Sequence, residues 1–366
     1  MMKLLKNLIN AESTPKKGEL DAAKTIADFF KKTAIDVNID SWDKNRANIL
    51  AHIKSNSQKP AILFLCHLDV VEPGQTHWKS NPFQATEKNG RIYGRGAADM
   101  KAGTAAVAQA IVQIHKSNIP LKGDIFFLAS AGEESDSCGI KRFLKNYKNI
   151  PNLTAVIVPE PTDFDVVTSH NGSFWLRIAT TGKAAHGATP HLGINAISSA
   201  KILLDELENF KSQYLTKGCS LSVNTITGGN TINIVPDYCT IGIDIRTTID
   251  QSHQEIIDKL HQLFEKIKKQ NPDFNAEIQI IRDVNALQTD NESQAVKQFL
   301  STVAADKPIA VSYCTDGSFL APLNVPVIIF GPGNPQLCHK ADEYVEIKDC
   351  EKAVEHYKNI IMKFLT

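Results

Sequence analysis

The chain contains the run Lys59-Pro-Ala-Ile-Leu-Phe-Leu-Cys66-His67-Leu-Asp69, in which an apolar segment leads directly into His67 and Asp69. A continuous apolar run of this length is typical of a strand covered on both faces, as in a largely parallel α/β sheet. Ligands of open α/β sheets bind beyond the carboxyl ends of the strands, so we expect such strand-end residues to gather at one sheet edge. Three further runs have the same design: 124–129 before Glu133 and Glu134, 154–159 before Glu160, and 325–330 before His339.

The composition indicates a globular protein of roughly two domains. The 366 residues include 40 Lys and Arg and 40 Asp and Glu, so the formal net charge is zero, which argues against a nucleic-acid binder. No apolar run reaches the ~18 residues of a transmembrane helix. Lys6 and Asn7 interrupt the first apolar residues, which favours a helical turn over a secretory signal. Seven scattered cysteines form no disulfide framework, so we predict a reduced, cytoplasmic location.

The middle of the chain predicts a second module. Alternating or amphipathic patterns favour strands at 174–180, 220–226, 240–246 and 276–281, and helices at 191–210 and 252–269. The order β-α-β-β-α-β is that of a ferredoxin-like fold. We therefore predict an α/β protein with a mostly parallel sheet, formed by residues 1–172 and 287–366, and an inserted α+β domain at 173–286.

His67 and Asp69 are two residues apart, so their side chains point to the same side of an extended segment. Imidazole is a good metal ligand, and a neighbouring carboxylate can orient the ring. A polar strand end that caps the next loop is the alternative. Cys66 points to the opposite side of the strand and is left out of the site.

Asp99 lies in a Gly-rich turn before a predicted helix at 101–117, in Gly94-Arg-Gly-Ala-Ala-Asp99-Met-Lys101-Ala-Gly103. An aspartate at this position is a favoured helix N-cap. A carboxylate also has two oxygens, which can bridge two metal ions about 3.5–4 Å apart. Both interpretations remain open.

Glu133 and Glu134 diverge if their segment is extended, so one could bind a metal while the other acts as general base. A solvated acidic turn is the alternative. Glu160 stands between two prolines, which would aim its carboxylate rigidly, although a plain turn has the same pattern. His339 follows a Gly-Pro-Gly turn and could equally be an ordinary surface histidine.

Together these strand-end residues offer two His, two Glu and one shared Asp, with a further Glu as base. A mixed nitrogen and oxygen set suits two Zn²⁺ ions and also Co²⁺ or Mn²⁺, and no thiolate set competes with it. Such ions lower the pKa of water and make hydroxide available at neutral pH. The sequence therefore predicts a dinuclear metal site.

The motifs resemble those of the dinuclear zinc amidohydrolases, which include acetylornithine deacetylase, succinyl-diaminopimelate desuccinylase, aminoacylases and several di- and carboxypeptidases. The resemblance covers nearly the whole chain and implies a catalytic α/β domain with an inserted lid or dimerisation domain, a homodimer, and a place in amino-acid biosynthesis. The motifs that carry it occur in the family's order: His67-Leu-Asp69, Gly94-Arg-Gly-Ala-Ala-Asp99-Met-Lys, Gly132-Glu133-Glu134, Glu160-Pro, Gly182-Lys-Ala-Ala-His186-Gly and Cys338-His339-Lys-Ala-Asp-Glu343-Tyr.

The resemblance also implies a role for each matching residue. His67 and Glu160 would bind one zinc ion, Glu134 and His339 the other, and Asp99 would bridge them. Glu133 would be the general base and acid, and Asp69 would orient His67. His186 would stabilise the oxyanion from the lid, often across a dimer. Arg246 and Asn233 would hold the substrate's carboxylate. The turn at 315–318 could add backbone donors or simply begin a helix.

The function implied is metal-dependent hydrolysis of the amide bond of a small N-acyl amino acid. A dipeptidase or carboxypeptidase of the same family is the runner-up. A non-catalytic relative that binds an amino acid or serves as a scaffold is a third possibility, but it should lack at least one of these residues. A dehydrogenase is excluded because no GxGxxG opens the first strand–helix unit. No nucleic-acid or membrane partner is expected.

Overall fold

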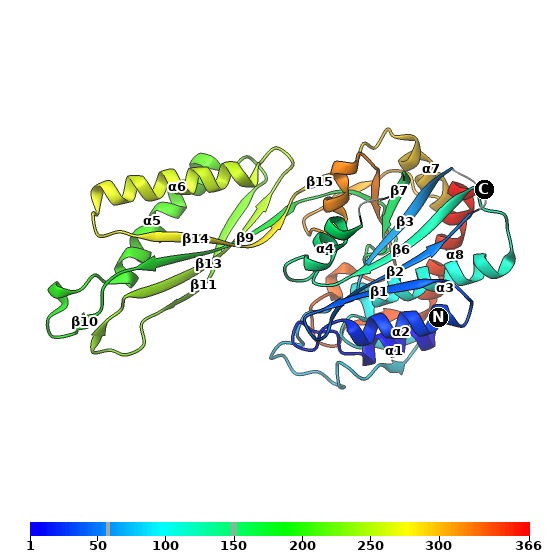
Figure 1. The fold of residues 1–366 in the computed structure, drawn as a ribbon, viewed down its shortest axis with the longest axis horizontal. Coiled ribbons are helices and arrows are strands. Elements are labelled where there is room, and N and C mark those ends of the chain that lie inside the picture. The colour runs from blue at the N-terminus through cyan, green and yellow to red at the C-terminus, as the bar shows by residue number, and fades with distance from the viewer. Residues whose placement is uncertain (56–58, 148–149, 151) are drawn as a thin grey trace. The chain divides into compact units, whose positions relative to one another are not determined.

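Figure 1 shows the computed structural model of the chain, which describes residues 1–55, 59–147, 150 and 152–366. The chain divides into two compact units, each with its own apolar core. The first unit consists of Met1–Ser169, Gln288–Val311 and Thr315–Thr366, and the second of His170–Leu287 and Ser312–Cys314. The predicted borders were 172/173 and 286/287. That the second unit serves as a lid or dimerisation domain stays a prediction.

The first unit is built on a large mixed sheet, which has nine strands within the described residues. Their order is β1-β2-β6-β3-β7-β17-β8-β15, and β16 pairs with β8. The central strands β6, β3, β7 and β17 run parallel, whereas β1, β2 and β8 pair antiparallel with their neighbours. The predicted α/β class is therefore confirmed, and the parallel part is the centre of the sheet. The bounds are β1 Val37–Trp42, β2 Arg46–Ile53, β3 Lys59–His67, β6 Gly123–Ser130, β7 Leu153–Val158, β8 Val167–His170, β15 Leu287–Gln288, β16 Ile309–Val311 and β17 Val327–Ile329.

Helices pack on this sheet because successive residues of its central strands are buried on both faces. On β3, Ile62, Phe64 and Cys66 join the core that the helices cover, and Leu63 and Leu65 are buried on the other face. Helices α3 and α8 lie against each other and contact β3 (Figure 1). The helices of this unit are α1 Met2–Asn10, α2 Leu20–Lys31, α3 Ala102–Ser117, α4 Cys138–Asn146, α7 Gln294–Val303 and α8 Ile347–Leu365, with shorter helical turns at Ala97–Lys101, Asp316–Leu323 and Pro335–Leu337.

A small antiparallel sheet joins distant parts of the chain. It has the order β18-β5-β4, and its strands are β4 Thr86–Lys88, β5 Arg91–Tyr93 and β18 Tyr344–Glu346. Tyr344 pairs with Tyr93 and Glu346 with Arg91. The residues that follow β5 and those that precede β18 are therefore brought together.

The second unit is a four-stranded antiparallel sheet of order β11-β13-β9-β14, with two helices on one face. Alternate residues of β13 are buried, because one face packs on the helices and the other does not. Its core joins Leu176 and Ile243 of the sheet to Leu207 and Leu260 of the helices. The elements are β9 Gly172–Thr181, α5 Ala196–Tyr214, β11 Ser220–Gly228, β13 Tyr238–Thr247, α6 His253–Gln270 and β14 Ala276–Val284, and a separate pair is formed by β10 Ala185–His186 and β12 Ile234–Val235.

The β-α-β-β-α-β order predicted for this unit matches the order of its main elements. The predicted start of the first helix, at residue 191, is wrong. A short helical turn at Pro190–Leu192 comes first, and α5 begins at Ala196, where the Asn195 side chain accepts hydrogen bonds from two backbone N–H groups. All seven cysteines are free thiols. Among the described residues, no helix is long and apolar enough to cross a membrane.

Candidate metal centre

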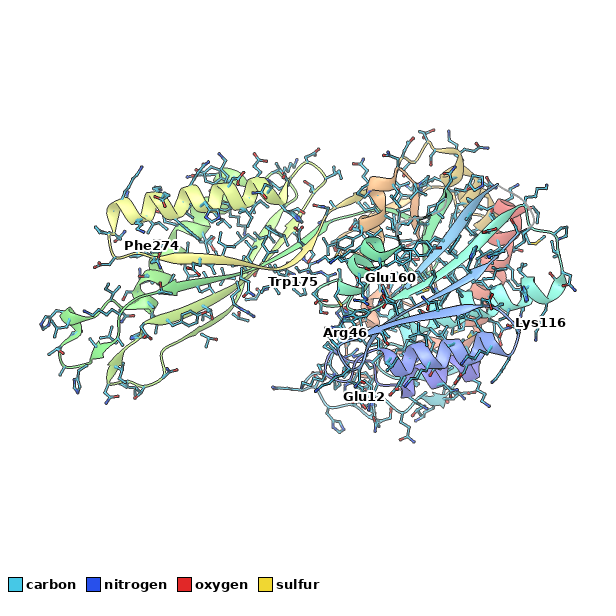
Figure 2. The ribbon with its side chains drawn as sticks, viewed as in Figure 1. Glu12, Arg46, Lys116, Glu160, Trp175 and Phe274 are labelled. Carbon is cyan, nitrogen blue, oxygen red and sulfur yellow. The ribbon has the colours of Figure 1, made fainter. Side chains whose placement is uncertain are left out.

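The predicted ligands of the first unit come from different elements that end at the same edge of the sheet. His67 is the last residue of β3, Glu134 lies in the turn after β6, and Glu160, labelled in Figure 2, follows β7. Asp99 lies in the turn Ala97–Lys101 before α3, and His339 follows the turn Pro335–Leu337. Parallel strands present their carboxyl ends together, which explains how residues far apart in sequence meet here.

Asp99 stands between two histidines, and each of its oxygens faces a different one. His67 Nε2 lies 3.1 Å from Asp99 Oδ1, and His339 Nε2 lies 3.3 Å from Asp99 Oδ2. A further carboxylate accompanies each histidine: Glu160 Oε1 is 3.6 Å from His67 Nε2, and Glu134 Oε1 is 2.9 Å from His339 Nε2. The donors thus form two groups, each with one imidazole and one glutamate, on either side of a shared aspartate.

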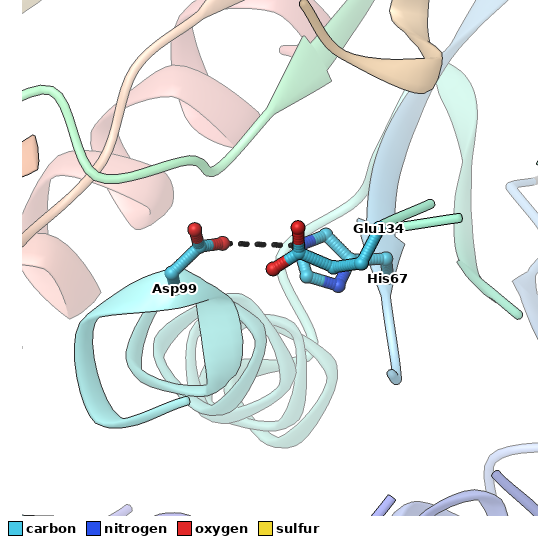
Figure 3. A group of neighbouring side chains, drawn as sticks. All are labelled: His67, Asp99 and Glu134. Atoms are coloured by element: carbon cyan, nitrogen blue, oxygen red, sulfur yellow. Dashed lines mark hydrogen bonds and ion pairs between the residues drawn. The ribbon is translucent and has the colours of Figure 1, made fainter. Parts of the chain in front are cut away.

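A subset of these side chains is close enough to hold one ion. One ligand atom each from His67, Asp99 and Glu134 lies within 4.8 Å of the others (Figure 3). His67 is 2% exposed and Glu160 6%, so these donors are largely removed from water. Buried imidazole and carboxylate donors at such distances are the set that zinc and related divalent ions take in proteins. The residues present therefore fit a divalent ion, and the arrangement with two ions stays a prediction.

Asp99 is not the N-cap of the following helix. The N-cap of α3 is Lys101, and no side chain makes a capping hydrogen bond there. Its carboxylate is directed instead to His67 and His339. The capping interpretation that the sequence left open is thereby ruled out.

The segment of Glu133 and Glu134 is a turn rather than an extended strand end. The N–H groups of Ser135 and Ser137 both donate to the carbonyl of Gly132, which has a φ of +78°. A Cβ at Gly132 would lie 2.8 Å from Arg46 Nη2, so a larger residue would be strained and crowded here. Figure 2 labels Arg46 in the first unit. The turn is not solvated at its start, because Glu133 is only 7% exposed.

Asp69 contacts both His67 and this turn. The Nδ1 of His67 hydrogen-bonds the main-chain carbonyl of Asp69 at 3.0 Å, whereas the Asp69 carboxylate is 3.7 Å from that nitrogen. The carboxylate accepts hydrogen bonds from the backbone N–H groups of Glu133 and Glu134, at 3.1 and 3.0 Å. The ring of His67 is thus oriented by the backbone of Asp69, and the side chain of Asp69 orders the turn.

Packing of α3 brings Glu160 toward Asp99. A Cβ on Gly103 would lie 2.0 Å from the carbonyl oxygen of Pro159, so only glycine allows the helix this close to the end of β7. Pro159 immediately precedes Glu160. Gly103 is therefore needed because the backbones of α3 and of the end of β7 approach each other closely next to the site.

The electrostatics of the site call for added positive charge. Burial, followed by the charge of Asp99, raises the pKa of Glu134 to about 7. Burial also raises the pKa of Glu160 well above its usual value, against the attraction of His67. Hydrogen bonds with Asp99 and Glu134 raise the pKa of His339 to about 11. Buried carboxylates crowd one another here, and a divalent cation is the group that relieves such crowding.

The pKa of His67 responds to the same carboxylates. Burial lowers it, but the charge of Glu160 and the hydrogen bond with Asp99 outweigh burial and hold this pKa well above its usual value. Burial raises the pKa of Asp99, but hydrogen bonds with His339 and His67 outweigh burial and bring it below its usual value. Without a metal ion, the two imidazoles thus stabilise the negative charge of Asp99.

His186, Asn233 and Arg246 belong to the second unit, so their contribution to the site stays a prediction. His186 lies on β10 and pairs with Ile234 of β12, and its Nδ1 accepts the N–H of Ala188 at 3.0 Å. The main-chain carbonyl of Asn233 accepts the N–H of Gly187, so His186 and Asn233 are close neighbours. Arg246 lies on β13, where Asp244 Oδ1 is 3.0 Å from its Nε.

The turn at 315–318 begins a helix. The Thr315 side chain caps the helical turn Asp316–Leu323 by accepting the N–H of Gly317 at 3.2 Å. Arg95 and Glu343 lie inside the quoted motifs, but no sequence pattern gives either of them a role. Each is 1% exposed, and their burial as charged residues is the signal that singles them out.

Residues 63–363 match the sequence pattern of Peptidase family M20/M25/M40. The chain belongs to this family. The resemblance inferred from the motifs is thereby confirmed, and with it the prediction of an enzyme of the amidohydrolase and metallopeptidase class. The matched span contains all five predicted ligands, Asp69 and Glu133.

The family relationship extends over whole chains. A probable succinyl-diaminopimelate desuccinylase of Staphylococcus aureus is 30% identical, with 100% of this chain and 97% of the relative covered. Acetylornithine deacetylase of Buchnera aphidicola is also 30% identical, over 93% of this chain and 89% of its own. Among solved structures, a metallo-carboxypeptidase of the M20 family from Sulfolobus solfataricus has a TM-score of 0.79 at 20% identity, over 98% of both chains. This last similarity supports the same fold.

Proposed function

We propose that this member of the M20 family hydrolyses the amide bond of a small N-acyl amino acid, of the acetylornithine or succinyl-diaminopimelate type. The observation that carries the proposal is the division of donors around Asp99, with one His–Glu pair facing each of its oxygens. The names of two relatives at 30% identity support the substrate class. Both reactions belong to amino-acid biosynthesis, as the motifs imply.

His67 and Glu160 would hold one divalent ion, Glu134 and His339 the other, and Asp99 both. Zinc is our first assignment, with Co²⁺ or Mn²⁺ as alternatives, because imidazole and carboxylate donors suit all three. Such ions would supply Lewis acidity, which polarises the amide carbonyl and lowers the pKa of an attacking water.

Glu133 is the general base and acid in this proposal. Its neighbour Glu134 reaches the ligand group, while its own backbone N–H is held by Asp69 at 3.1 Å. As a base, Glu133 would take a proton from the attacking water and would return it to the leaving amine. Its 7% exposure keeps the carboxylate in a largely dry place, where proton transfer is not diverted to bulk solvent.

His186 would stabilise the oxyanion of the tetrahedral intermediate, and Arg246 and Asn233 would bind the substrate's carboxylate. Arginine suits this task because its planar guanidinium can make two parallel hydrogen bonds. Asp244 already shares the Arg246 guanidinium, at 3.0 Å from Nε, which would hold the side chain in place for a ligand.

We also propose a homodimer through the second unit. Strand β11 is an edge strand of its sheet, so one row of its backbone groups is open to pairing. Val223 and Ile226 on this strand are 36% and 56% exposed, and Tyr238 at the start of β13 is 54% exposed. An edge strand with exposed apolar side chains favours association with a second copy. A cytoplasmic location stays a prediction from the scattered cysteines.

The test is metal reconstitution combined with a substrate panel. Protein stripped of metal by a chelator is loaded with increasing Zn²⁺ and assayed with N-acetylornithine, N-succinyl-diaminopimelate and a set of dipeptides. We expect activity to require metal and to be highest on an N-acyl amino acid. Highest activity on dipeptides would assign the enzyme to the dipeptidase and carboxypeptidase group, and metal-independent activity would refute the proposed mechanism.

A further inference from the structure

A buried ion pair joins the segment that carries Asp99 to the segment that carries His339. Arg95 Nη1 donates to Glu343 Oε2 at 2.6 Å, and each residue is 1% exposed. Arg95 comes just after β5 and Glu343 just before β18, and the N–H of Gly94 donates to the main-chain carbonyl of Glu343. The ion pair therefore continues the pairing of these two strands toward the candidate site.

The second oxygen of Glu343 binds the backbone next to Asp99. Glu343 Oε1 accepts hydrogen bonds from the N–H of Ala98 at 2.9 Å and from the N–H of Asp99 at 3.2 Å. A carboxylate that accepts backbone N–H groups makes charge-assisted hydrogen bonds, which are stronger than neutral ones. Glu343 thus restrains the main chain from which the Asp99 carboxylate projects.

The guanidinium of Arg95 binds the backbone at His339. Arg95 Nη2 donates to the main-chain carbonyl of His339 at 3.3 Å, and Nη1 donates to that of Lys340 at 3.2 Å. His339 has a φ of +64°, in the left-handed region that residues other than glycine rarely adopt. Such a conformation persists where the surroundings hold it, and Arg95 supplies part of that restraint.

We propose that Arg95 and Glu343 are positioning residues that set the separation of Asp99 and His339, and through it the affinity of the site for divalent metal. The inference rests on the proposed function, because it takes Asp99 and His339 as metal ligands. Neither residue of the pair is among the proposed metal ligands. They act through the backbone: Glu343 on the Asp99 side, Arg95 on the His339 side, and the 2.6 Å contact between them links the two.

The chain offers a matched control on the same two strands. Arg91 of β5 and Glu346 of β18 form an ion pair at 2.7 Å, with side chains 38% and 27% exposed. Their residues pair directly in the β5–β18 register. Replacing Glu346 removes an ion pair between the two strands next to Arg95 and Glu343, without removing the contacts of Glu343 to Ala98 and Asp99.

The measurement is the affinity of the metal-free full chain for Zn²⁺, by competition with a chromogenic chelator at a temperature where circular dichroism shows a folded protein. Glu343→Gln keeps the size of the side chain but removes its charge and places an amide N–H₂ toward Arg95. We expect zinc affinity to fall by about 10–100-fold, the effect typical of residues that orient metal ligands. Glu346→Gln should bind zinc as the wild type does.

Arg95→Lys is the second variant, which keeps the positive charge but has one nitrogen in place of the fork. It can reach Glu343 or the His339 carbonyl but not both, so zinc affinity should fall again. The double variant Arg95→Lys/Glu343→Gln should be no weaker than the poorer single variant, because both changes break one unit. A purely structural pair would lower the thermal unfolding midpoint of the metal-free protein and leave zinc affinity unchanged.

The outcomes separate this inference from the proposed function. If the wild type binds no zinc, the proposed function itself fails. If the wild type binds zinc and hydrolyses substrate while Glu343→Gln and Arg95→Lys bind it equally tightly, only the positioning role is overturned. Failure of both variants to fold would likewise overturn the positioning role and leave a pair needed for folding alone.

Discussion

The carboxylate of Asp69 accepts the backbone N–H of Glu134 at 3.0 Å, and its other oxygen accepts the N–H of Glu133 at 3.1 Å. The main-chain carbonyl of the same residue hydrogen-bonds His67 Nδ1 at 3.0 Å. One residue thus connects the proposed base, a proposed ligand on one side of the site and a proposed ligand on the other.

Replacing Asp69 should disturb the turn and spare the ring of His67, since the bond to His67 comes from the backbone. We expect Asp69→Ala to lower zinc affinity by about 10–100-fold and to reduce kcat, as loss of a ligand-orienting partner does. Asp69→Asn keeps one acceptor oxygen and should lie between Ala and wild type. Chelator competition measures the zinc affinity and steady-state kinetics measure kcat. Wild-type values for Asp69→Ala would show that the turn of Glu133 and Glu134 does not depend on the Asp69 carboxylate.

Glu133→Gln should separate catalysis from metal binding. The change keeps size and shape but removes the proton acceptor, so kcat should fall by about 10²–10⁴-fold. Metal content, measured by elemental analysis, should stay near wild type because Glu133 is not a proposed ligand, whereas Glu134 Oε1 lies 2.9 Å from His339 Nε2. Loss of metal in this variant, or near-normal turnover, would reverse the roles assigned to the two glutamates.

Asp99→Asn tests the bridging role, since capping does not explain this residue in the structure. An amide oxygen is a poor bridge between two cations, so we expect a folded protein that has lost most of its bound metal and activity. Asp349→Asn is the control, because Asp349 is another acidic residue in a helical first turn, that of α8. Full metal content in Asp99→Asn would exclude the bridge.

His186→Ala tests the second unit's part in catalysis. Metal content should be unchanged, and kcat should fall by about 10²–10³-fold, the usual effect of removing an oxyanion donor. If His186 acts in the partner's site, mixing His186→Ala with Glu133→Gln chains should restore activity, because one site of each heterodimer then holds both intact residues. No recovery despite proven subunit exchange would place His186 in its own chain's site.

Stability should depend on pH through His170. Burial lowers the pKa of His170 to about 4 from an ordinary value of 6.5, so the folded protein holds it neutral while the unfolded chain takes up a proton. The contribution of neutral His170 to the free energy of unfolding is fully present above pH 6.5 and is lost as the pH falls toward 4. From pH 7.5 to pH 5 this one group should remove about 2 kcal/mol from the free energy of unfolding.

The matched variant is His170→Asn, which does not titrate and keeps an N–H donor for the Asn171 carbonyl that His170 Nδ1 contacts at 2.8 Å. Denaturant unfolding of both proteins at the two pH values isolates the histidine, since all other groups are common to them. An equal pH dependence in the two proteins would contradict the lowered pKa.

Most strands and helices could be predicted from local patterns, because a strand buried on both faces needs a continuous apolar run and a surface helix an amphipathic one. The run at 59–66 is β3, and the pattern at 252–269 is α6. The predicted start of α5 is wrong because apolar periodicity does not reveal at which residue an N-cap begins a helix. Asn195 decides that boundary by accepting two N–H groups.

The sequence by itself determined the family, the α/β class and the residues that end the central strands, since each of these is recorded in short motifs and local periodicity. Tertiary structure alone decided that each oxygen of Asp99 faces a different histidine. It also decided that the Asp69 carboxylate binds the turn of Glu134, and that Arg95 pairs with Glu343. The last two residues are 248 positions apart. Their contact depends on β18 pairing with β5, which a long-range register sets and no local pattern in either segment specifies.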